Sequence, residues 1–461
     1  MKVKLKNVGM LDEAEFEVGN ITLICGENNT GKTYATYSLY GYLDFMRIVR
    51  ESFFIRKRRL FDDENLNNDI KDTQEIKLTY VDIKNKLENH IKNKTRLYSH
   101  HILVEVLAGK NEDFANAEFN VDMQISLESV KQAIKKYLEN LNLNNKTKAK
   151  HIIYDDGIGF SNLNKFEFEE YLEIFFDNLL NYILMKNFIL SVERTGASIF
   201  REESDFIKLA KLEAMQKMLK EDIYSFEIHK KIEEKKKLYP KPVRDNIDFI
   251  RDIPQKSKLE SMFKKDKDKY KNILDLLGKV VGGKYKATDY GILYQPKGSK
   301  KFFNIEVASS STRSLLMLYF YILHVAQKGD ILMIDEPELN LHPKNQILLA
   351  RLLVLLANAG IKIFITTHSD YIVRELNNCI MLNNFTNEKI KENFIEYDDN
   401  YKLSKKDVNA YIAFYDKKSK KNTLKKVDIS NENGIDMETF NDVIEQTINI
   451  DEKMASMFME D

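Results

Sequence analysis

The chain has few of the residues that stabilise secreted proteins, and it has no long apolar run. Only two of its 461 residues are cysteine, and Cys25 and Cys379 both lie in apolar runs, which favours buried thiols over a disulfide. The N-terminus lacks the apolar segment of a signal peptide, and no run reaches the ~20 apolar residues that a membrane span needs. We therefore expect a cytoplasmic protein that has no membrane partner.

Metal-binding motifs and excess charge are also missing. The eight histidines are scattered, without CxxC or HExxH, so we predict no structural zinc. Lys+Arg and Asp+Glu each total 71, so no overall field attracts nucleic acid or membrane. Nucleic acid stays open as a partner, because local basic stretches occur at 56–59, 229–237 and 256–271. Acidic residues interleave most of these stretches, which favours solvated helix faces.

Proline is absent before Pro240, and the patterns before it are long and mostly helical. Lysine- and glutamate-rich helical patterns at 203–235 and 256–276 flank Pro240 and Pro242. A proline pair between charged helices is typical of a helical hairpin or a short coiled-coil arm, although a plain helical bundle fits equally well.

Strand patterns lie near both ends of the chain. Residues 2–8, 13–18 and 21–25 form three short apolar or alternating runs that predict strands. FILSV at 188–192 predicts another buried strand, and strands alternate with helices from about 285 to 382. This alternation predicts an α/β fold with a mostly parallel, buried sheet.

A glycine-containing loop after the third strand carries the strongest functional signal. It matches GxxxxGK[ST] in full, follows a strand and opens a helix, which is the context of a P-loop. In such a loop, backbone N–H groups and the helix dipole bind phosphates. Lys32 is expected to reach the β- and γ-phosphates of ATP, and Thr33 to ligate Mg²⁺. The predicted phosphate-binding residues are Gly26, Asn28, Asn29, Thr30, Gly31, Lys32 and Thr33.

Two carboxylates end a second apolar run. Asp335 and Glu336 directly follow residues 331–334, which places both acids at the carboxyl edge of a buried strand beside the P-loop. Strands often end in acidic residues, so this pattern alone is weak evidence. Together with the P-loop upstream it indicates a nucleotide site. Asp335 would hold Mg²⁺ through water, and Glu336 would orient or deprotonate the attacking water.

A lone histidine follows a third apolar run. His368 comes after residues 363–367 in a polar turn, where an imidazole can donate to a γ-phosphate and sense its loss. A single histidine is usually structural. Its place one strand beyond the acidic pair favours a catalytic role here.

The P-loop, the acidic pair and the histidine, in this order, resemble the ABC-ATPase superfamily, most closely its OLD, RecF and SMC-like branch. Residues 336–343 read EPELNLHP, a complete match to the EPExxLHP of that branch. The resemblance implies an ABC-ATPase head that is split by a large helical insertion, and a D-loop at 336–343 that crosses to a partner subunit. It is strong over about 1–40 and 300–380.

The resemblance also locates a signature motif, usually LSGGQ, at residues 308–314 (ASSSTRS) before an apolar helix. Hydroxyls and N–H groups at a helix N-terminus can contact a γ-phosphate, so ATP contacts are predicted for Ser309, Ser310, Ser311 and Arg313. Serine replaces both glycines of the motif, which leaves the donor atoms open, and an ordinary helix cap is the alternative. In the family this segment serves the opposite protomer's ATP. A head-to-tail homodimer or higher homo-oligomer is therefore implied.

No Gln-loop is recognisable. By position, its substitute is residues 193–196, where Arg194 could approach a phosphate. A salt bridge within the insertion is an equally good interpretation of this arginine.

The motifs divide the chain into six expected parts. These are an N-terminal ATPase lobe with the P-loop (1–50), a helical insertion (51–185), a return strand with a lid-like segment (186–202), a helical hairpin arm (203–276), a C-terminal ATPase lobe (277–395) and a small C-terminal extension (396–461).

The resemblance also suggests what the ATPase serves. Many OLD-family proteins carry a Toprim nuclease, but the acids after His368 do not form its pattern, so we expect no nuclease activity in this chain. A stand-alone ATPase of this kind is similar to ATPase subunits of bacterial anti-phage systems such as PARIS and Septu, which implies a separate effector, a nuclease or toxin, as partner. A RecF- or SMC-like ATPase that binds DNA in repair is the alternative, and a transporter ATPase is a weaker third.

Overall fold

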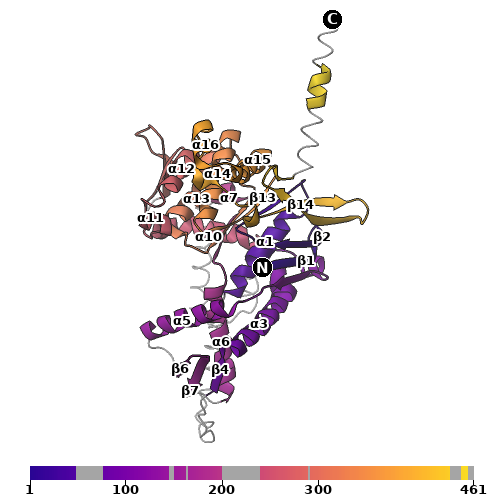
Figure 1. Cartoon of the computed structure of the whole chain (residues 1–461), viewed down its shortest axis with the longest axis vertical. Helices are drawn as coiled ribbons and strands as arrows, with labels where there is room; N and C mark the ends of the chain where they lie inside the picture. Colours follow the sequence, from indigo (N-terminus) through magenta and orange to yellow (C-terminus); the bar gives the residue numbers. More distant parts are fainter. Residues whose placement is uncertain are drawn as a thin grey trace, which may run out of the picture.

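A nine-stranded mixed sheet forms the centre of the molecule, with helices on both of its faces (Figure 1). The computed structural model describes residues 1–47, 76–144, 150–161, 165–199, 239–288, 291–436 and 448–454. Within these ranges the α/β class predicted from the sequence is confirmed.

The strand order of the central sheet brings the chain's two ends together. In space it runs β5 (Glu118–Asp122), β1 (Lys2–Val8), β2 (Leu11–Glu17), β15 (Lys421–Lys426), β14 (Val408–Asp416), β3 (Ile21–Gly26), β13 (Lys362–Thr367), β12 (Ile331–Asp335) and β8 (Asn187–Leu190). From β14 to β8 neighbouring strands are parallel, whereas β1 pairs antiparallel with β2 and β5. Because parallel strands share their carboxyl edge, β3, β12 and β13 end side by side.

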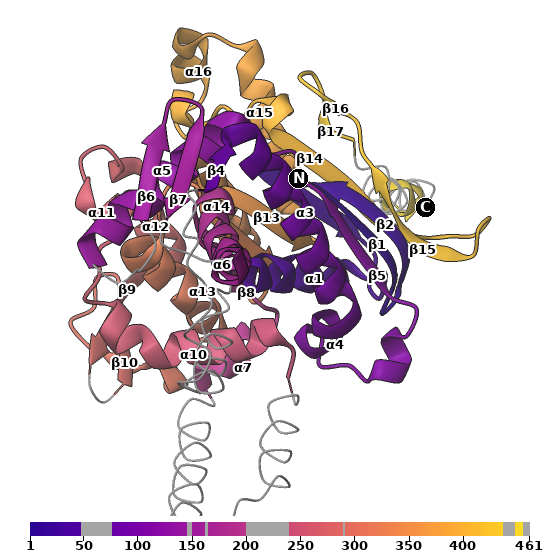
Figure 2. The ribbon, with the colours of Figure 1, turned by 90° about the horizontal axis from the view of Figure 1, so that it is seen from below.

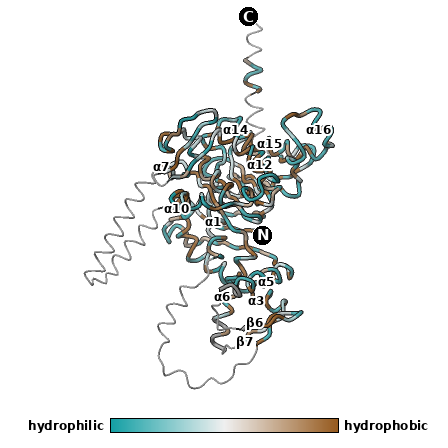
Figure 3. The backbone as a smooth tube through the Cα atoms, turned by 90° about the vertical axis from the view of Figure 1, so that its left-hand side faces the viewer, coloured by the Kyte–Doolittle hydropathy of each residue, from teal (hydrophilic) through white to brown (hydrophobic). Residues whose placement is uncertain are grey.

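The strands β3, β12 and β13 are buried on both faces, which explains their continuous apolar runs. Successive side chains of a strand point to opposite faces. Leu23 and Ile365 therefore join one core cluster, and Ile24 and Phe364 join the other. The hydropathy-coloured tube shows hydrophobic segments in the middle of this region (Figure 3).

One face of the sheet is covered by helices from the C-terminal half of the chain. Their side chains share a single core cluster with Leu23 of β3. The helices are α10 (Lys241–Lys256), α12 (Lys271–Val281), α13 (Ser310–Phe320) with its π-helical continuation η5 (Tyr321–Val325), α14 (Pro343–Asn358) and α15 (Asp370–Met381).

The other face is covered by α1 (Lys32–Met46), which starts directly at the P-loop, and by the described part of the insertion. The insertion helices are α3 (Tyr80–Leu97), η2 (Tyr98–Ile102), α4 (Leu103–Val106), η3 (Asn111–Phe114), α5 (Leu127–Asn144) and α6 (Lys165–Ile183).

The insertion expected at 51–185 is largely helical in its described part, but it is not helical throughout. It contains a three-stranded sheet in the order β4 (Ile76–Thr79), β7 (Gly157–Ser161) and β6 (Lys150–Tyr154). The two-residue turn at 155–156 joins β6 to β7. Glycine is needed at Gly157, because a side chain there would meet the Leu78 carbonyl oxygen at 2.0 Å. The segment 118–122 pairs with β1 and so belongs to the central sheet. Residues 48–75 lie outside the described residues.

The helical hairpin arm predicted for 203–276 lies only partly within the described residues. Residues 200–238 lie outside the described residues, and residues 241–281 pack into the core. Pro240 caps α10, whose Phe249, Ile250 and Ile253 form a buried stripe at helical spacing. Asn246 of α10 also exchanges hydrogen bonds with the backbone of β8 and Ser191. The numerous charges around this narrow stripe made the segment resemble a solvated arm.

The predicted C-terminal extension (396–461) contributes strands β14 and β15 to the central sheet. Its strand β14 lies between β15 and β3 and pairs with the whole of β3. Such a pairing joins residues far apart in the chain, which no local pattern reveals. Residues 448–454 are helical, and residues 437–447 lie outside the described residues.

The remaining elements are short. They include an antiparallel sheet of β9 (Gly283–Thr288), β10 (Gly291–Pro296) and β11 (Phe303–Asn304), the pair β16 (Ile429–Ser430) and β17 (Gly434–Ile435), and the helices α7 (Arg194–Ile199), α11 (Met262–Lys265), η4 (Ile305–Val307), η6 (Leu382–Asn384), α16 (Asn387–Asn393), η7 (Asp399–Tyr401) and η8 (Lys405–Asp407). Among the described helices, none has the length and apolarity to cross a membrane.

Candidate functional site

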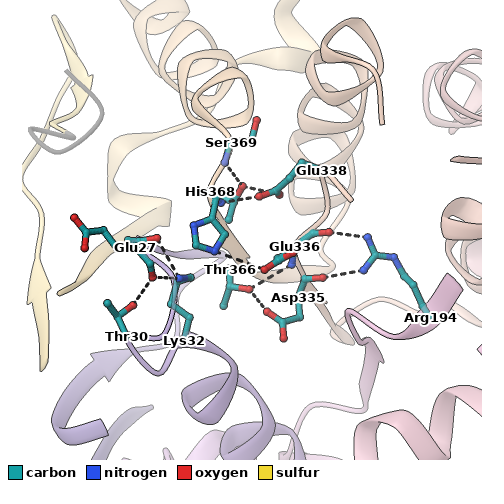
Figure 4. Close-up of polar contacts among 12 residues, drawn as sticks. Glu27, Thr30, Lys32, Arg194, Asp335, Glu336, Glu338, Thr366, His368 and Ser369 are labelled. Carbon is teal, nitrogen blue, oxygen red and sulfur yellow. Dashed lines mark hydrogen bonds and ion pairs between the residues drawn. The ribbon is translucent and has the colours of Figure 1, made fainter. Parts of the chain in front are cut away.

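The loops after β3, β12 and β13 meet at the carboxyl edge of the sheet and form the candidate site (Figure 4). The structure thereby brings together the P-loop lysine Lys32, the acidic pair Asp335 and Glu336, and His368. Their separation along the chain is bridged by the parallel pairing of three neighbouring strands.

The P-loop has a backbone that only glycine allows at two positions. Gly26 has φ of 139° and Gly31 has φ of 92°, both in the region that favours glycine. A side chain at Gly26 would meet the Ala413 carbonyl oxygen at 2.0 Å, and one at Gly31 would meet Leu11 Cγ at 2.5 Å. The loop therefore keeps its shape only with glycine at both positions.

The polar side chains of the P-loop are divided between the inside and the outside of the loop. Lys32 is buried, and its Nζ donates to the carbonyl oxygens of Gly26 at 3.1 Å and Glu27 at 2.6 Å. Thr30 is also buried and donates to Glu27 O at 2.8 Å. Asn28, Asn29 and Thr33 are exposed at the outer surface of the loop. An incoming phosphate can therefore reach these three residues directly, whereas Lys32 must exchange its carbonyl partners for the phosphate.

Asp335 is a buried carboxylate with one oxygen unused. Its Oδ1 accepts a hydrogen bond from the Thr366 hydroxyl, whereas Oδ2 is buried without a hydrogen-bond partner among the described residues. Burial raises the pKa of Asp335 to about 6, and the hydroxyls of Thr366 and Thr33 oppose this shift.

These oxygens fit a magnesium ion. Mg²⁺ prefers oxygen ligands and is usually held by one or two carboxylates together with substrate phosphates and water. The orphaned Oδ2 of Asp335 and the exposed hydroxyl of Thr33 offer such ligands. No group of three or more His, Cys, Asp or Glu side chains that could hold a metal ion occurs in the described ranges.

Glu336 lies in a strained turn directly after β12. Its φ is 53°, and its N–H donates to Thr366 O at 3.1 Å. Its side chain is partly exposed, and Oε1 lies 3.6 Å from Nε2 of His368. His368, more than any other group, lowers the pKa of Glu336, so this carboxylate is ionised at neutral pH and able to accept a proton.

Arg194 does not contact the phosphate side of the site, nor does it form a salt bridge in the insertion. Its guanidinium is buried and donates to three backbone carbonyls, those of Ser191 at 2.9 Å, Asp335 at 2.8 Å and Glu336 at 2.6 Å. Burial lowers its pKa to about 10, and the nearby acids oppose that shift. Arg194 therefore holds the Asp335–Glu336 turn, and its contact with ATP stays a prediction.

Sequence reasoning missed the role of Glu338. Its carboxylate accepts from the His368 backbone N–H at 2.6 Å and from the Thr367 hydroxyl at 2.7 Å. Burial raises the pKa of this carboxyl group. Glu338 thus ties the segment after β12 to the histidine turn after β13. The motif EPExxLHP contained this residue, but nothing in the motif names its partner.

The signature segment lies at the start of α13 and forms hydrogen bonds mainly within itself. Ser309 is the N-cap and accepts from the Thr312 N–H at 3.3 Å, while Arg313 donates to the Ala308 carbonyl and to Ser310 Oγ at 3.2 Å. Ser309 and Ser310 are exposed, and Ser311 is partly exposed. No hydrogen bond or ion pair between described residues joins this segment to Lys32, Asp335 or His368 of the same chain. The helix-cap role is therefore present, and it leaves the exposed hydroxyls available to another molecule.

Comparisons with solved structures find distant likenesses. The Smc head domain of Pyrococcus furiosus with an extended coiled coil, bound to the C-terminal domain of ScpA, is 12% identical, with 98% of each chain covered and a TM-score of 0.31. An SmcHead bound to the C-winged helix domain of ScpA is 11% identical over 93% of this chain and 97% of that chain, with a TM-score of 0.35. The SMC head domain of Thermotoga maritima is 9% identical over 93% of this chain and 98% of that chain, with a TM-score of 0.31.

No curated protein matches the chain. A family model described as AAA ATPase domain matches residues 1–373, which includes the P-loop, the acidic pair and the histidine. The chain belongs to the AAA ATPase domain family.

Proposed function

We propose that the chain binds Mg·ATP at residues 26–33 and hydrolyses its γ-phosphate bond. The observation that carries this proposal is the convergence of Lys32, Asp335, Glu336 and His368 at one edge of the sheet, within a family of ATPases. Phosphoryl transfer to water requires a cation at the phosphates, a carboxylate for the metal and an ionised base. Lys32, Asp335 and Glu336 provide these three groups.

Each residue has a separate task in the proposed reaction. Lys32 leaves the Gly26 and Glu27 carbonyls for the β- and γ-phosphates, and the loop N–H groups bind the remaining oxygens. Asp335 and Thr33 would hold Mg²⁺, which would supply neutralisation of the phosphate charge. Glu336 orients the attacking water and takes its proton, while His368 holds the Glu336 side chain and contacts the γ-phosphate. Arg194 and Glu338 position these two residues.

We further propose that two copies meet head to tail, so that Ser309, Ser310, Ser311 and Arg313 contact the partner's ATP. Their exposure and the lack of bonds to the chain's own P-loop support this arrangement. A monomer would then hold ATP without the full set of donors that hydrolysis needs.

The molar mass of the Glu336→Gln protein, measured by light scattering with and without Mg·ATP, tests both proposals. We expect ATP to double the mass, because the variant binds ATP but cannot hydrolyse it. Lys32→Ala in the same background is the matched control and should stay a monomer. A monomer under all conditions, with ATP bound, would reject the head-to-tail arrangement and keep the ATPase proposal.

As a biological role we propose a nucleotide switch that controls a separate effector, a nuclease or toxin, in anti-phage defence. The resemblance of the sequence, as an ATPase without a nuclease pattern, to stand-alone ATPase subunits of anti-phage systems supports this hypothesis. Cells that carry the chain with its neighbouring genes should resist phages that plate on cells with the Lys32→Ala variant. Equal plating across a broad phage panel would count against defence and favour the DNA-repair alternative.

A further inference from the structure

The lysines of the chain are distributed unevenly, although the net charge is zero. Residues 256–301 contain thirteen lysines, no arginine and five acidic residues. Much of this excess lies in the β9–β10–β11 sheet and the turns beside it. In two perpendicular views these elements lie on one side of the molecule, with β1, β2 and β15 on the opposite side (Figures 1 and 2).

The opposite side shows how the chain treats lysines on an exposed sheet. There Lys4 lies 3.1 Å from Glu15, Lys421 lies 3.6 Å from Glu13, and Lys426 pairs with Glu17. Acids of β2 thus lie close to three of the lysines on that sheet. Among the described residues, no such ion pair joins the lysines around β9 and β10 to an acid.

The β9–β10–β11 sheet has a basic outer face. Along β9, Lys284 and Lys286 are exposed and alternate with the buried residues Gly283 and Tyr285. The strand register places Lys284 opposite Gln295, and Lys286 opposite Leu293. The two lysines therefore point to the same side of the sheet, next to polar or partly exposed neighbours.

Four more exposed lysines surround this face. Lys297 donates its backbone N–H to Gly282 O at 2.9 Å, which fixes it beside the first residues of β9. Lys279 lies in the last turn of α12, which Gly282 ends. Lys300 and Lys301 follow in the turn before β11. Within the part of the chain that the structure describes, none of the six lysines forms an ion pair, and no acid lies between 279 and 288 or between 291 and 301.

Aromatic rings complete the surface. Phe302 and Phe303 follow Lys301 directly and are 48% and 42% exposed. Such rings are costly to leave in water singly, but they provide stacking surfaces for nucleobases beside lysines that bind phosphates. A lipid surface requires a broader apolar face than one with Gln295 at its centre offers.

We propose that this surface, defined as Lys279, Lys284, Lys286, Lys297, Lys300, Lys301 and Phe302, binds single-stranded nucleic acid. The lysines contact the phosphates, and Phe302 stacks against a base. Only η4 separates β11 from the Ser309 cap of α13, so the bound strand lies next to the signature segment. Nucleic acid is thereby placed where it can influence the contact between two ATPase subunits.

The test is fluorescence anisotropy with a labelled single-stranded DNA of about 20 nucleotides, longer than a typical single-strand site. The variant Lys284→Glu/Lys286→Glu/Lys297→Glu is compared with Lys405→Glu/Lys406→Glu/Lys417→Glu, which makes the same charge change at exposed lysines elsewhere. We expect the first variant to bind at least about tenfold more weakly and to lose about two units of salt dependence, since three phosphate contacts disappear. The control should match the parent protein.

Two further measurements keep the result interpretable. Both variants should bind ATP like the parent protein, which shows that the fold and the P-loop are intact and keeps this inference separate from the ATPase proposal. Phe302→Ala should weaken binding severalfold with the salt dependence unchanged. Equal losses in the two triple variants, no binding by the parent protein, or binding of anionic vesicles in place of the oligonucleotide would each overturn the proposal.

Discussion

The two segments proposed to contact ATP are held in very different ways. Around Asp335 and Glu336 the structure is fixed from several elements, because Thr366 on β13 and Arg194 on α7 bind the turn and His368 lies beside it. These contacts connect distant parts of the chain and are mostly buried. The acidic side of the site is therefore built completely by one chain.

The signature segment is exposed, and its polar groups bond mainly to one another. Ser309 caps its own helix, and Arg313 contacts Ala308 and Ser310. Surface groups of this kind gain little from one another, because water competes for the same hydrogen bonds. The difference indicates that the acidic side is preorganised for chemistry, whereas the signature side is available for association.

Among the variants that test this difference, Glu336→Gln is expected to have the largest effect on turnover. The amide cannot accept the proton of water, so turnover should fall about 10³-fold while ATP affinity is kept. Steady-state turnover and equilibrium ATP binding measure the two effects. Glu27→Gln, an exposed carboxylate of the P-loop, is the control and should keep normal turnover. Parental rates in Glu336→Gln would assign the base elsewhere.

Lys32→Ala should act on binding. A lost charge-assisted contact to phosphate is worth up to about 3 kcal/mol, so ATP affinity should fall about 100-fold. Isothermal titration with a non-hydrolysable ATP analogue measures it, with the exposed Lys6→Ala on β1 as control. Unchanged affinity would remove the phosphate role from this lysine.

Arg194→Ala tests whether the acidic side depends on its support from α7. Two carbonyls of the Asp335–Glu336 turn would lose their donor, so we expect kcat to fall about 30-fold and ATP affinity to change little. Arg194→Lys should recover part of the rate, because an ammonium retains the charge but not the two-pronged geometry. A large loss of affinity with kcat maintained would support the direct phosphate contact.

Asp335→Asn should stabilise the protein while removing its magnesium ligand. The pKa of Asp335 is raised to about 6 in the folded chain and lies near 3.9 when unfolded, so the carboxylate destabilises the fold above about pH 6 and has no such effect below about pH 4. We expect a gain of up to about 3 kcal/mol at pH 7.5, which disappears as the pH falls toward 4. Urea unfolding without nucleotide or Mg²⁺ measures it, and a pH-independent difference would contradict this cause.

Ser310→Phe should give the smallest effect on the isolated chain. The position is exposed, so ATP affinity of the monomer and stability should stay within about 0.5 kcal/mol of the parent protein. The increase of turnover with protein concentration, which reports association, should decrease severalfold. If that increase is intact, the segment serves only as a helix cap.

The sequence was sufficient to locate the strands that end in Gly26, Asp335 and Thr367, because buried parallel strands are continuous apolar runs. The polar residues directly after these strands could be located from the same observation. The partners of Arg194 and Glu338 could not be predicted, since tertiary packing decides which backbone groups a buried charge meets. For the same reason β14 was assigned to an extension, although its pairing with β3 is the longest-range contact of the site.

The place of β14 also affects how the protein is made. During synthesis the P-loop strand emerges early, but its neighbour β14 begins only at Val408. Until then Gly26 lacks the Ala413 backbone that lies against its loop. Chains cut before β14 would consequently lose one wall of the P-loop, and we expect them to bind ATP poorly.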